Sequence, residues 1–251
     1  MPDRGVDRPP LPDEVQEANR LTQRLLRARA LGLRRIDKRT AGGRFNDRAY
    51  ARGRFERATG RPASSHPWTI TREITAPLEE PHALLVIDTS GSMSAHEYAL
   101  GPIVWIVTTA LRAVGGKVAT VLFGNGAAVL SDGTEPMVKV PAIRVGGGTA
   151  FAGDAIAIGA GHLEMDNRRR PRAVYIVSDG GWWDTEAGAQ KIRRLAELGA
   201  PTIHLSIGAE PLSVEASRIC VLTDPADGLD VIAQHTVDAL TAAHRRRRAP
   251  A

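Results

Sequence analysis

The amino-acid sequence predicts a doubly wound α/β fold, in which helices cover both faces of a mostly parallel sheet. From residue 81 onward, short apolar runs alternate with segments whose apolar residues recur at helical spacing. In several of these runs both the odd-numbered and the even-numbered residues are apolar, which is typical of parallel strands buried on both faces. With 43% hydrophobic residues, the chain of 251 residues can build a core of this kind.

Five apolar runs are the expected strands of the sheet. A further short strand is expected after the second run, because Asn125-Gly126 separates it from another apolar stretch and this dipeptide favours a tight hairpin. That strand would be antiparallel and would lie at the edge of the sheet. The five runs are ALLVI (83–87), VATVLF (118–123), AVYIVS (173–178), TIHLSI (202–207) and ICVLT (219–223).

Helices are expected between the strands. The apolar residues of 103–114 fall on one helical face, and Gly115 and Gly116 end that helix. Further helices are expected around Ile192 and over residues 229–244. Because strands and helices alternate in this way, the connections suit a parallel sheet.

The first 80 residues differ in composition and are expected to form a basic arm that is mainly helical or extended. They hold 17 Lys and Arg against 11 Asp and Glu, whereas the remaining residues hold 16 against 17. Leucines at helical spacing predict a helix over about residues 13–34, and PWTITREIT (67–75) could add a strand. The predicted domains are the arm (1–80), the α/β domain (81–244) and a basic C-terminal tail (245–251).

Three polar segments are expected at the edge of the predicted sheet where doubly wound folds bind ligands. DTSGS (88–92) follows the first strand, GGGTAF (146–151) places Thr149 at the expected start of a helix, and SDGG (178–181) ends the third strand. The segments contain hydroxyls and two carboxylates, with no thiolate and no histidine. Oxygen ligands select hard cations, so the segments predict a Mg²⁺ site, or Mn²⁺, formed by Asp88, Ser90, Ser92, Thr149 and Asp179.

This set of motifs resembles the metal-ion-dependent adhesion site of von Willebrand factor type A (VWA) domains. The pattern of that site is Asp-x-Ser-x-Ser, then a Thr in a Gly-Gly-Thr loop, then an Asp in a Ser-Asp-Gly segment, and all five positions match. The resemblance covers roughly residues 82–244. It implies that the three hydroxyls contact the metal, that the two aspartates often act through waters, and that a ligand Asp or Glu completes the coordination.

The basic arm ahead of DTSGS adds a narrower resemblance. Its arrangement is similar to that of bacterial VWA proteins that work beside MoxR-type AAA+ ATPases, and to the VWA-bearing subunit of cobalt chelatase. This resemblance implies a protein partner, with an AAA+ ATPase of the MoxR type as the candidate. Trp182 and Trp183 directly follow SDGG and would form a partner-binding rim, since aromatic residues anchor interfaces.

The leading function is therefore a non-enzymatic, metal-dependent protein-binding module whose Mg²⁺ bridges an acidic residue of the partner. No base or nucleophile is arranged beside the predicted ligands, which argues against catalysis. Two alternatives stay open. One is a Mg²⁺-dependent hydrolase or phosphotransferase that uses the same crevice. The other is nucleic-acid binding by the basic ends.

The aromatic residues of the arm argue against the nucleic-acid alternative. Phe45, Tyr50 and Phe55 read as isolated anchors, too sparse to suggest base stacking. The start of the sequence has no apolar signal region, and no apolar run approaches membrane-spanning length. We therefore expect a cytoplasmic protein that does not enter a membrane.

Overall fold

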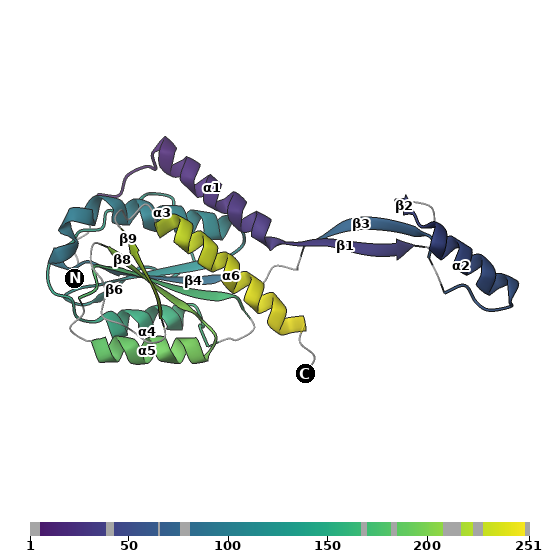
Figure 1. Cartoon of the computed structure of the whole chain (residues 1–251). Coiled ribbons are helices and arrows are strands. Elements are labelled where there is room, and N and C mark those ends of the chain that lie inside the picture. The colour runs from purple at the N-terminus through teal and green to yellow at the C-terminus, as the bar shows by residue number, and fades with distance from the viewer. Residues whose placement is uncertain are drawn as a thin grey trace. The chain divides into compact units, whose positions relative to one another are not determined.

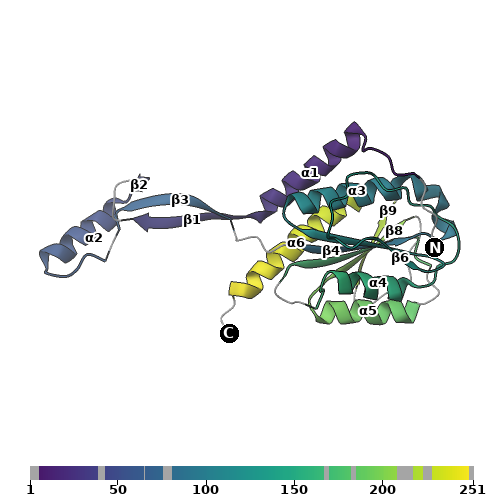
Figure 2. The same ribbon diagram turned by 180° about the vertical axis from the view of Figure 1, so that it is seen from behind.

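The computed structural model describes residues 6–38, 43–64, 66–75, 81–166, 170–181, 185–207, 217–222 and 228–248. Contacts divide the chain into two units (Figures 1 and 2). Unit 1 comprises Met1–Ala28 and Leu78–Ala251, and unit 2 comprises Arg29–Pro77. The first 28 residues, which composition assigns to the arm, therefore group with the large sheet.

Unit 1 is built on a six-stranded sheet with the strand order β6-β5-β4-β7-β8-β9. Neighbouring strands from β5 to β9 run parallel, and β6 pairs antiparallel with β5 at one edge. This confirms the predicted mostly parallel α/β fold with one short antiparallel edge strand. The strands are β4 (His82–Asp88), β5 (Lys117–Phe123), β6 (Ala127–Ser131), β7 (Arg172–Ser178), β8 (Thr202–Ile207) and β9 (Ser217–Leu222).

Helices cover both faces of this sheet. Helices α1, α3 and α6 pack on one face, and α4 and α5 pack on the other (Figure 1). The last helix extends beyond the predicted limit at residue 244. The bounds are α1 (Pro12–Arg29), the short 3-10 helix η1 (Gly91–His96), α3 (Glu97–Ala113), α4 (Ala152–His162), α5 (Thr185–Glu197) and α6 (Gly228–Arg248).

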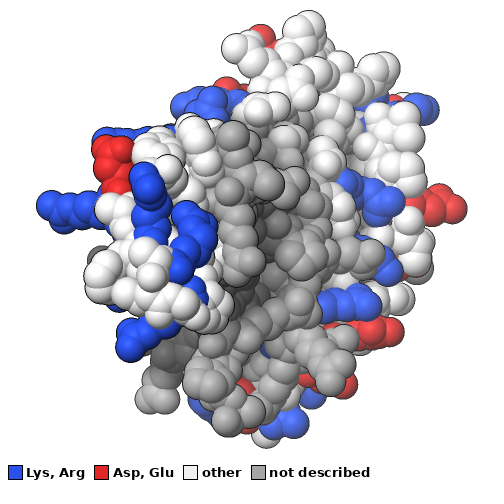
Figure 3. All heavy atoms as spheres, turned by 90° about the vertical axis from the view of Figure 1, so that its right-hand side faces the viewer, with Lys and Arg blue, Asp and Glu red and all other residues white. Residues whose placement is uncertain are grey.

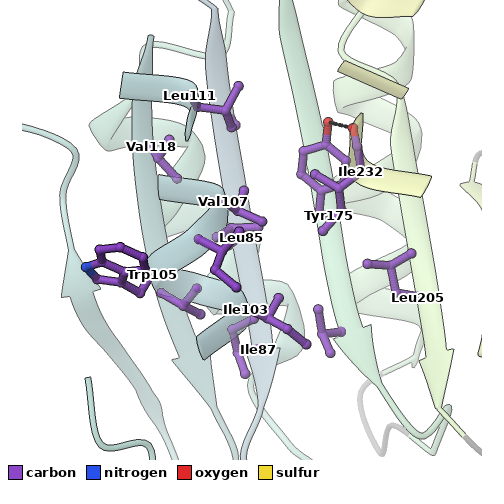
Figure 4. Packing of buried hydrophobic residues seen from close by; sticks show 14 of the residues in the cluster. Leu85, Ile87, Ile103, Trp105, Val107, Leu111, Val118, Tyr175, Leu205 and Ile232 are labelled. Carbon is purple, nitrogen blue, oxygen red and sulfur yellow. Dashed lines mark hydrogen bonds between the residues drawn. The ribbon is translucent and has the colours of Figure 1, made fainter. Parts of the chain in front are cut away.

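Strand β4 shows why the sheet needs helices on both sides. All of its residues are buried. Leu85 and Ile87 belong to the apolar cluster with α3 and α6, whereas Leu84 and Val86 belong to the cluster with α4 and α5. Figure 4 shows the first cluster, in which Val107 of α3 lies close to Leu85. Because successive side chains of a strand point to opposite faces, a continuous apolar run requires cover on both.

The N-terminal residues of unit 1 are fixed to it by backbone and side-chain contacts. Arg8 and Val140 exchange two backbone hydrogen bonds, of 3.1 and 2.9 Å between N and O. The Arg8 guanidinium also pairs with the Glu14 carboxylate near the start of α1. Further along the helix, Leu21 and Leu25 are buried in the core. This helix is therefore part of unit 1.

Unit 2 is a three-stranded antiparallel sheet with one helix. Strands β1 (Ala30–Lys38) and β2 (Arg44–Phe45) both pair with the central strand β3 (Trp68–Thr75), which confirms the predicted strand. Helix α2 (Asp47–Ala58) follows β2, and the side chain of Asn46 accepts a hydrogen bond from the Ala49 backbone N at 3.2 Å. The predicted helix over residues 13–34 is wrong beyond Arg29, because the next residues form β1.

Among the residues that the structure describes, none of the helices combines the length and the apolar character that crossing a membrane requires.

Candidate metal site

The structure places the predicted metal ligands at the carboxyl end of the parallel strands. Asp88 is the last residue of β4, and Ser90 and Ser92 follow it into η1. Asp179 directly follows β7, the strand that pairs with β4. Thr149 lies three residues before α4, rather than at its start as predicted. The described structure contains all five residues, whereas Trp182 and Trp183 lie outside the described residues.

Asp88 is held by hydrogen bonds at both of its carboxylate oxygens. Oδ1 accepts from the backbone N of Ser90, and Oδ2 accepts from the Ser178 hydroxyl, each at 2.8 Å. Burial is the largest influence on the pKa of Asp88 and raises it. The hydrogen bonds from Ser90 and Ser178 oppose that rise, and the negative charge of Asp179 adds to it. A cation at this edge would favour the ionised form of Asp88.

Ser90 and Ser92 form a pair of adjacent hydroxyls. Their Oγ atoms are 2.9 Å apart. Ser90 is buried and Ser92 is exposed, so the pair extends from the interior to the surface. The intervening chain is anchored by Met93, which is fully buried and whose backbone N donates to the Ser90 carbonyl at 3.1 Å. Alternating hydroxyls on a turning backbone can thus serve one ligand site.

The glycine loop before Thr149 is fastened to the DTSGS segment. The backbone N of Gly146 donates to the Thr89 carbonyl at 2.8 Å. In the opposite direction, the backbone N of Gly91 donates to the Gly147 carbonyl at 3.2 Å. These two bonds hold the loop that carries Thr149 against the DTSGS segment.

Asn125 also holds this loop, a role that the sequence did not reveal. Its Oδ1 accepts a hydrogen bond from the Gly148 backbone N at 2.6 Å. Gly147 has a φ of 111°, and a Cβ built there would come within 2.2 Å of the Asn125 side-chain nitrogen. Only glycine suits this position without strain, because the backbone is left-handed and the neighbouring side chain is close. The sequence predicts Asn125 only as a hairpin residue and Ser178 only as part of SDGG, and does not predict that they hold Gly148 and Asp88.

Two oxygen atoms at this edge provide the test of whether a metal fits. Thr149 Oγ1 and Asp179 Oδ1 are buried and have no hydrogen-bond partner among the described residues. An unsatisfied buried polar group costs about 1–3 kcal/mol, and a cation bound beside these two oxygen atoms would remove that cost. A hard divalent cation accepts hydroxyl and carboxylate oxygens as ligands, either directly or through waters. The residues present therefore fit the metal that their motifs predict.

The character of the site differs from that of a zinc centre. The part of the chain that the structure describes contains no group of three or more His, Cys, Asp and Glu side chains that could hold a metal ion. A cation here would rely on hydroxyls together with Asp88 and Asp179. A donor set of this kind, made only of oxygen atoms, suits Mg²⁺ or Mn²⁺.

No family model and no curated protein matches the sequence. Among solved structures, the chain is similar to the manganese-loaded TRAP protein of Plasmodium vivax, with 12% identity and a TM-score of 0.46 over 63% of this chain and 74% of that chain. It is similar to proximal thread matrix protein 1 from the mussel byssus with a zinc-occupied MIDAS motif (16% identity, TM-score 0.45, 66% of this chain, 46% of that chain). A third similar structure is that of the ArnB paralog VWA2 from Sulfolobus acidocaldarius, with 20% identity and a TM-score of 0.38 over 66% of this chain and 48% of that chain. The chain spans less than half the length of the last two.

Proposed function

We propose that unit 1 is a metal-ion-dependent protein-binding module. In this proposal, Asp88, Ser90, Ser92, Thr149 and Asp179 hold a Mg²⁺ ion to which a partner protein adds an Asp or Glu carboxylate. The observation that carries the proposal is the pair of buried oxygens without partners, Thr149 Oγ1 and Asp179 Oδ1, at the strand edge that also bears the serine hydroxyls. Mn²⁺ would suit the same oxygen donors.

The chain's own residues divide the work of such a site. When bound, the cation supplies positive charge and coordination positions for carboxylate oxygens. Asp88 orients the DTSGS turn, because it accepts the Ser90 backbone N–H. Ser92 is exposed and lies at the surface end of the hydroxyl pair, where a partner side chain can approach. Thr149 is brought to the site by the glycine loop, whose hydrogen bonds fix its path.

We propose further that this site binds without catalysing a reaction. Both oxygens of Asp88 accept hydrogen bonds from within the chain, which suits a positioning group better than a general base. The competing proposal of a Mg²⁺-dependent hydrolase or phosphotransferase is tested by incubating the full chain with generic phosphate esters and Mg²⁺. We expect no turnover above that of the Ser90→Ala/Ser92→Ala variant.

For the partner, we propose an AAA+ ATPase of the MoxR type. This finer proposal rests on the resemblance of the motifs and the preceding basic arm to VWA proteins that work beside such ATPases. It predicts that retention of the partner requires the metal, because its carboxylate would be one of the metal's ligands.

The deciding experiment has two stages, and the first is a calorimetric titration of the full chain with Mg²⁺ and with Mn²⁺. We expect one binding event, and an affinity reduced by more than about tenfold in Ser90→Ala/Ser92→Ala. The matched control is Ser94→Ala, which removes another hydroxyl of η1, one that donates to the Gly91 carbonyl. If the double variant binds Mg²⁺ as tightly as the control, the assigned ligands are wrong.

The second stage is retention of proteins from a native extract by the tagged chain in Mg²⁺, in EDTA, and with the double variant. We expect a partner, identified by mass spectrometry, in the first condition alone. Retention of the same proteins in all three conditions would contradict binding through the metal.

A further inference from the structure

Unit 2 has a pocket of its own that the proposed metal site does not use. The pocket has a volume of about 470 Å³ and lies among α2, β2, the start of β3 and the loop that joins α2 to β3. Its lining includes three aromatic residues, Phe45, Tyr50 and Trp68. The sequence separates these residues by up to 23 positions, and the strand register brings two of them together by placing Phe45 opposite Trp68.

The aromatic side chains form a cluster that stays partly open to solvent. The ring centroids of Phe45 and Trp68 are 4.9 Å apart with the planes at 63°, and those of Phe45 and Tyr50 are 5.4 Å apart at 52°. Phe45 is 39% exposed and Tyr50 is 43% exposed. Large aromatic surface that remains exposed beside a pocket is typical of a site that a partner covers.

Small residues of α2 keep the pocket open. Ala49 and Gly53, one helical turn apart, both line it, and Gly53 is buried in the middle of the helix. Glycine is a poor residue for a helix interior, so local helix stability does not explain its presence. A larger side chain at this position would occupy space that now belongs to the pocket. A substitution of Gly53 by a larger residue is therefore a direct way to fill the pocket.

The surrounding backbone is fixed before any partner binds. The Glu56 carboxylate accepts hydrogen bonds from the backbone N and the hydroxyl of Ser64, at 2.8 and 2.7 Å. The backbone N of Asn46 donates to the Pro67 carbonyl at 2.8 Å. These bonds tie the middle and the end of the α2–β3 loop to Glu56 and Asn46, which lowers the conformational cost of forming the pocket on binding.

The segment that forms most of the pocket carries a strongly positive charge. Residues 44–61 contain six arginines, no lysine and two acidic residues, and all six arginines are exposed. Glu56, one of the two acids, is already engaged by Ser64 and lies 3.7 Å from the Arg52 guanidinium. Arg57 lines the pocket itself. Figure 3, turned so that the α2 end of Figure 1 faces the viewer, shows Lys and Arg side chains standing out on that side.

We propose that this pocket binds an acidic segment of a protein, with an aromatic anchor residue in the pocket and flanking carboxylates on the arginines. Guanidinium groups pair with carboxylates through two parallel hydrogen bonds, which favours arginine over lysine at such a surface. A single-stranded nucleic acid fits less well, because it uses open ring faces along a groove. Here the Phe45 ring meets Trp68 edge to face and Tyr50 at a tilt, around a single pocket.

The proposal is independent of the metal site and is tested on the full chain by fluorescence anisotropy. The probe is a fluorescein-labelled peptide with Asp and Glu in alternation on both sides of a central Trp. We expect it to bind, and to bind about tenfold more weakly when the central Trp is replaced by Ala. Gly53→Leu, which places a helix-favouring side chain in the pocket, should weaken binding by about tenfold or more. The matched control Ala51→Leu adds the same side chain at an exposed position of α2 outside the pocket.

Several results would overturn the proposal. They are absence of binding, equal affinity for the Trp and Ala peptides, or wild-type affinity in Gly53→Leu with an unchanged circular dichroism spectrum. Tighter binding of labelled oligothymidine than of the peptide would assign the pocket to nucleic acid instead. Arg57→Gln, which leaves the helix backbone intact, should also weaken binding and keeps the test valid if Gly53→Leu fails to fold. Binding should be the same in EDTA and in Ser90→Ala/Ser92→Ala, so the outcome is separate from that of the metal site.

Discussion

Unit 1 and unit 2 differ in where they place their large apolar side chains. In unit 1 every residue of the central strand β4 is buried, and helices cover both faces of the sheet. In unit 2, Phe45, Tyr50 and Phe55 remain 39%, 43% and 68% exposed. Since burying apolar surface is the main source of folding stability, aromatic residues left in solvent contribute little of it. Unit 1 thus uses the apolar residues of its sheet for stability, although it also exposes Tyr98 and Val138. For unit 2, we propose that the exposed rings of Phe45 and Tyr50 serve contact with a partner.

The polar groups differ between the two units in the same direction. Unit 1 buries Thr149 Oγ1 and Asp179 Oδ1 without partners, whereas unit 2 exposes six arginines over residues 44–61. Exposed charges are screened by salt, and buried ones are screened much less. Binding at unit 2 should therefore weaken as salt concentration rises, while metal binding at unit 1 should depend less on salt.

The largest expected effect comes from removing a core side chain. Leu85→Ala should lower the free energy of unfolding by about 2–5 kcal/mol, because Leu85 is completely buried and the surrounding core can relax only in part. In unit 2, Phe55→Ala should change the free energy by no more than about 0.5 kcal/mol, since the ring is mostly exposed. Urea unfolding followed by circular dichroism measures both. Similar losses in the two variants would show that the exposed Phe55 ring stabilises the fold as much as the buried Leu85 side chain does.

A smaller effect is expected from the glycine loop of unit 1. Gly147→Ala should lower the free energy of unfolding by about 1–2 kcal/mol, because a φ of 111° is strained for alanine and the new Cβ would meet Asn125. Mg²⁺ affinity should fall as well, since the same loop carries Thr149. Thermal denaturation and calorimetric titration measure the two effects. The control is Gly126→Ala, where a Cβ meets no atom within 4 Å; a loss as large as that of Gly147→Ala would contradict the stated cause.

The smallest effect concerns acid stability. His235 of α6 is buried, and its ring meets that of Tyr175 edge to face at 5.6 Å. Burial lowers the pKa of His235, and the hydrogen bond to Pro201 and the charge of Asp238 oppose this shift. Burial likewise lowers the pKa of His204 to about 4. As pH falls, these histidines therefore take up protons in the unfolded chain before they do so in the folded chain. The free energy of unfolding is at its full value above about pH 6.5 and decreases as pH falls below it.

Replacing His235 with Phe removes one of these protonation sites and keeps an aromatic ring beside Tyr175. We expect the melting temperature of His235→Phe to fall less steeply between pH 7 and about pH 5 than that of the unaltered protein. At neutral pH the free energy of unfolding of the variant should be lower by about 1 kcal/mol, because the hydrogen bond to the Pro201 backbone is lost. Thermal denaturation across this pH range gives the slope. Identical slopes would show that His235 does not contribute to acid sensitivity.

The strands of unit 1 could be predicted closely because their local signal agrees with their final environment. The run TIHLSI matches β8 at both ends, and ALLVI falls short of β4 by one residue at each end. Parallel strands buried on both faces are continuous apolar runs, and no distant part of the chain is needed to recognise them. The antiparallel edge strand was equally accessible, since Asn125-Gly126 is a local hairpin signal.

Unit 2 was less predictable because its structure depends on pairing between distant residues. The leucines of α1 continue into ALGLRRI, where Leu31 and Leu33 stand two positions apart, a strand spacing. Pairing of β1 with β3 sets Ala30 opposite Thr75, and nothing local announces a partner so far along the chain. The same limitation made Phe45 and Tyr50 read as isolated anchors, although they belong to one cluster.

The candidate metal site contains both residues that the sequence predicts and residues that it does not. The positions of Asp88 and Asp179 follow directly from the ends of two strands that pair in the sheet. The contributions of Asn125 and Ser178 arise only when loops from separate segments meet, so residue spacing could not reveal them. The start of α4 also differs from the prediction, because of Phe151. It caps α4 in a left-handed conformation with a φ of 67°, and this moves the helix start beyond Thr149.

The antiparallel pairing of β1 with β3 has a consequence for how the chain could be re-engineered. The chain leaves unit 1 after Ala28 and returns to it at Leu78, and the register places Ala30 opposite Thr75. The two ends of unit 2 are thus neighbours, as in a domain inserted into a host. A short flexible linker could replace the insert without cutting any strand of the six-stranded sheet. The same hairpin ends could be grafted onto a tight turn of another protein, which would make unit 2 a transferable module.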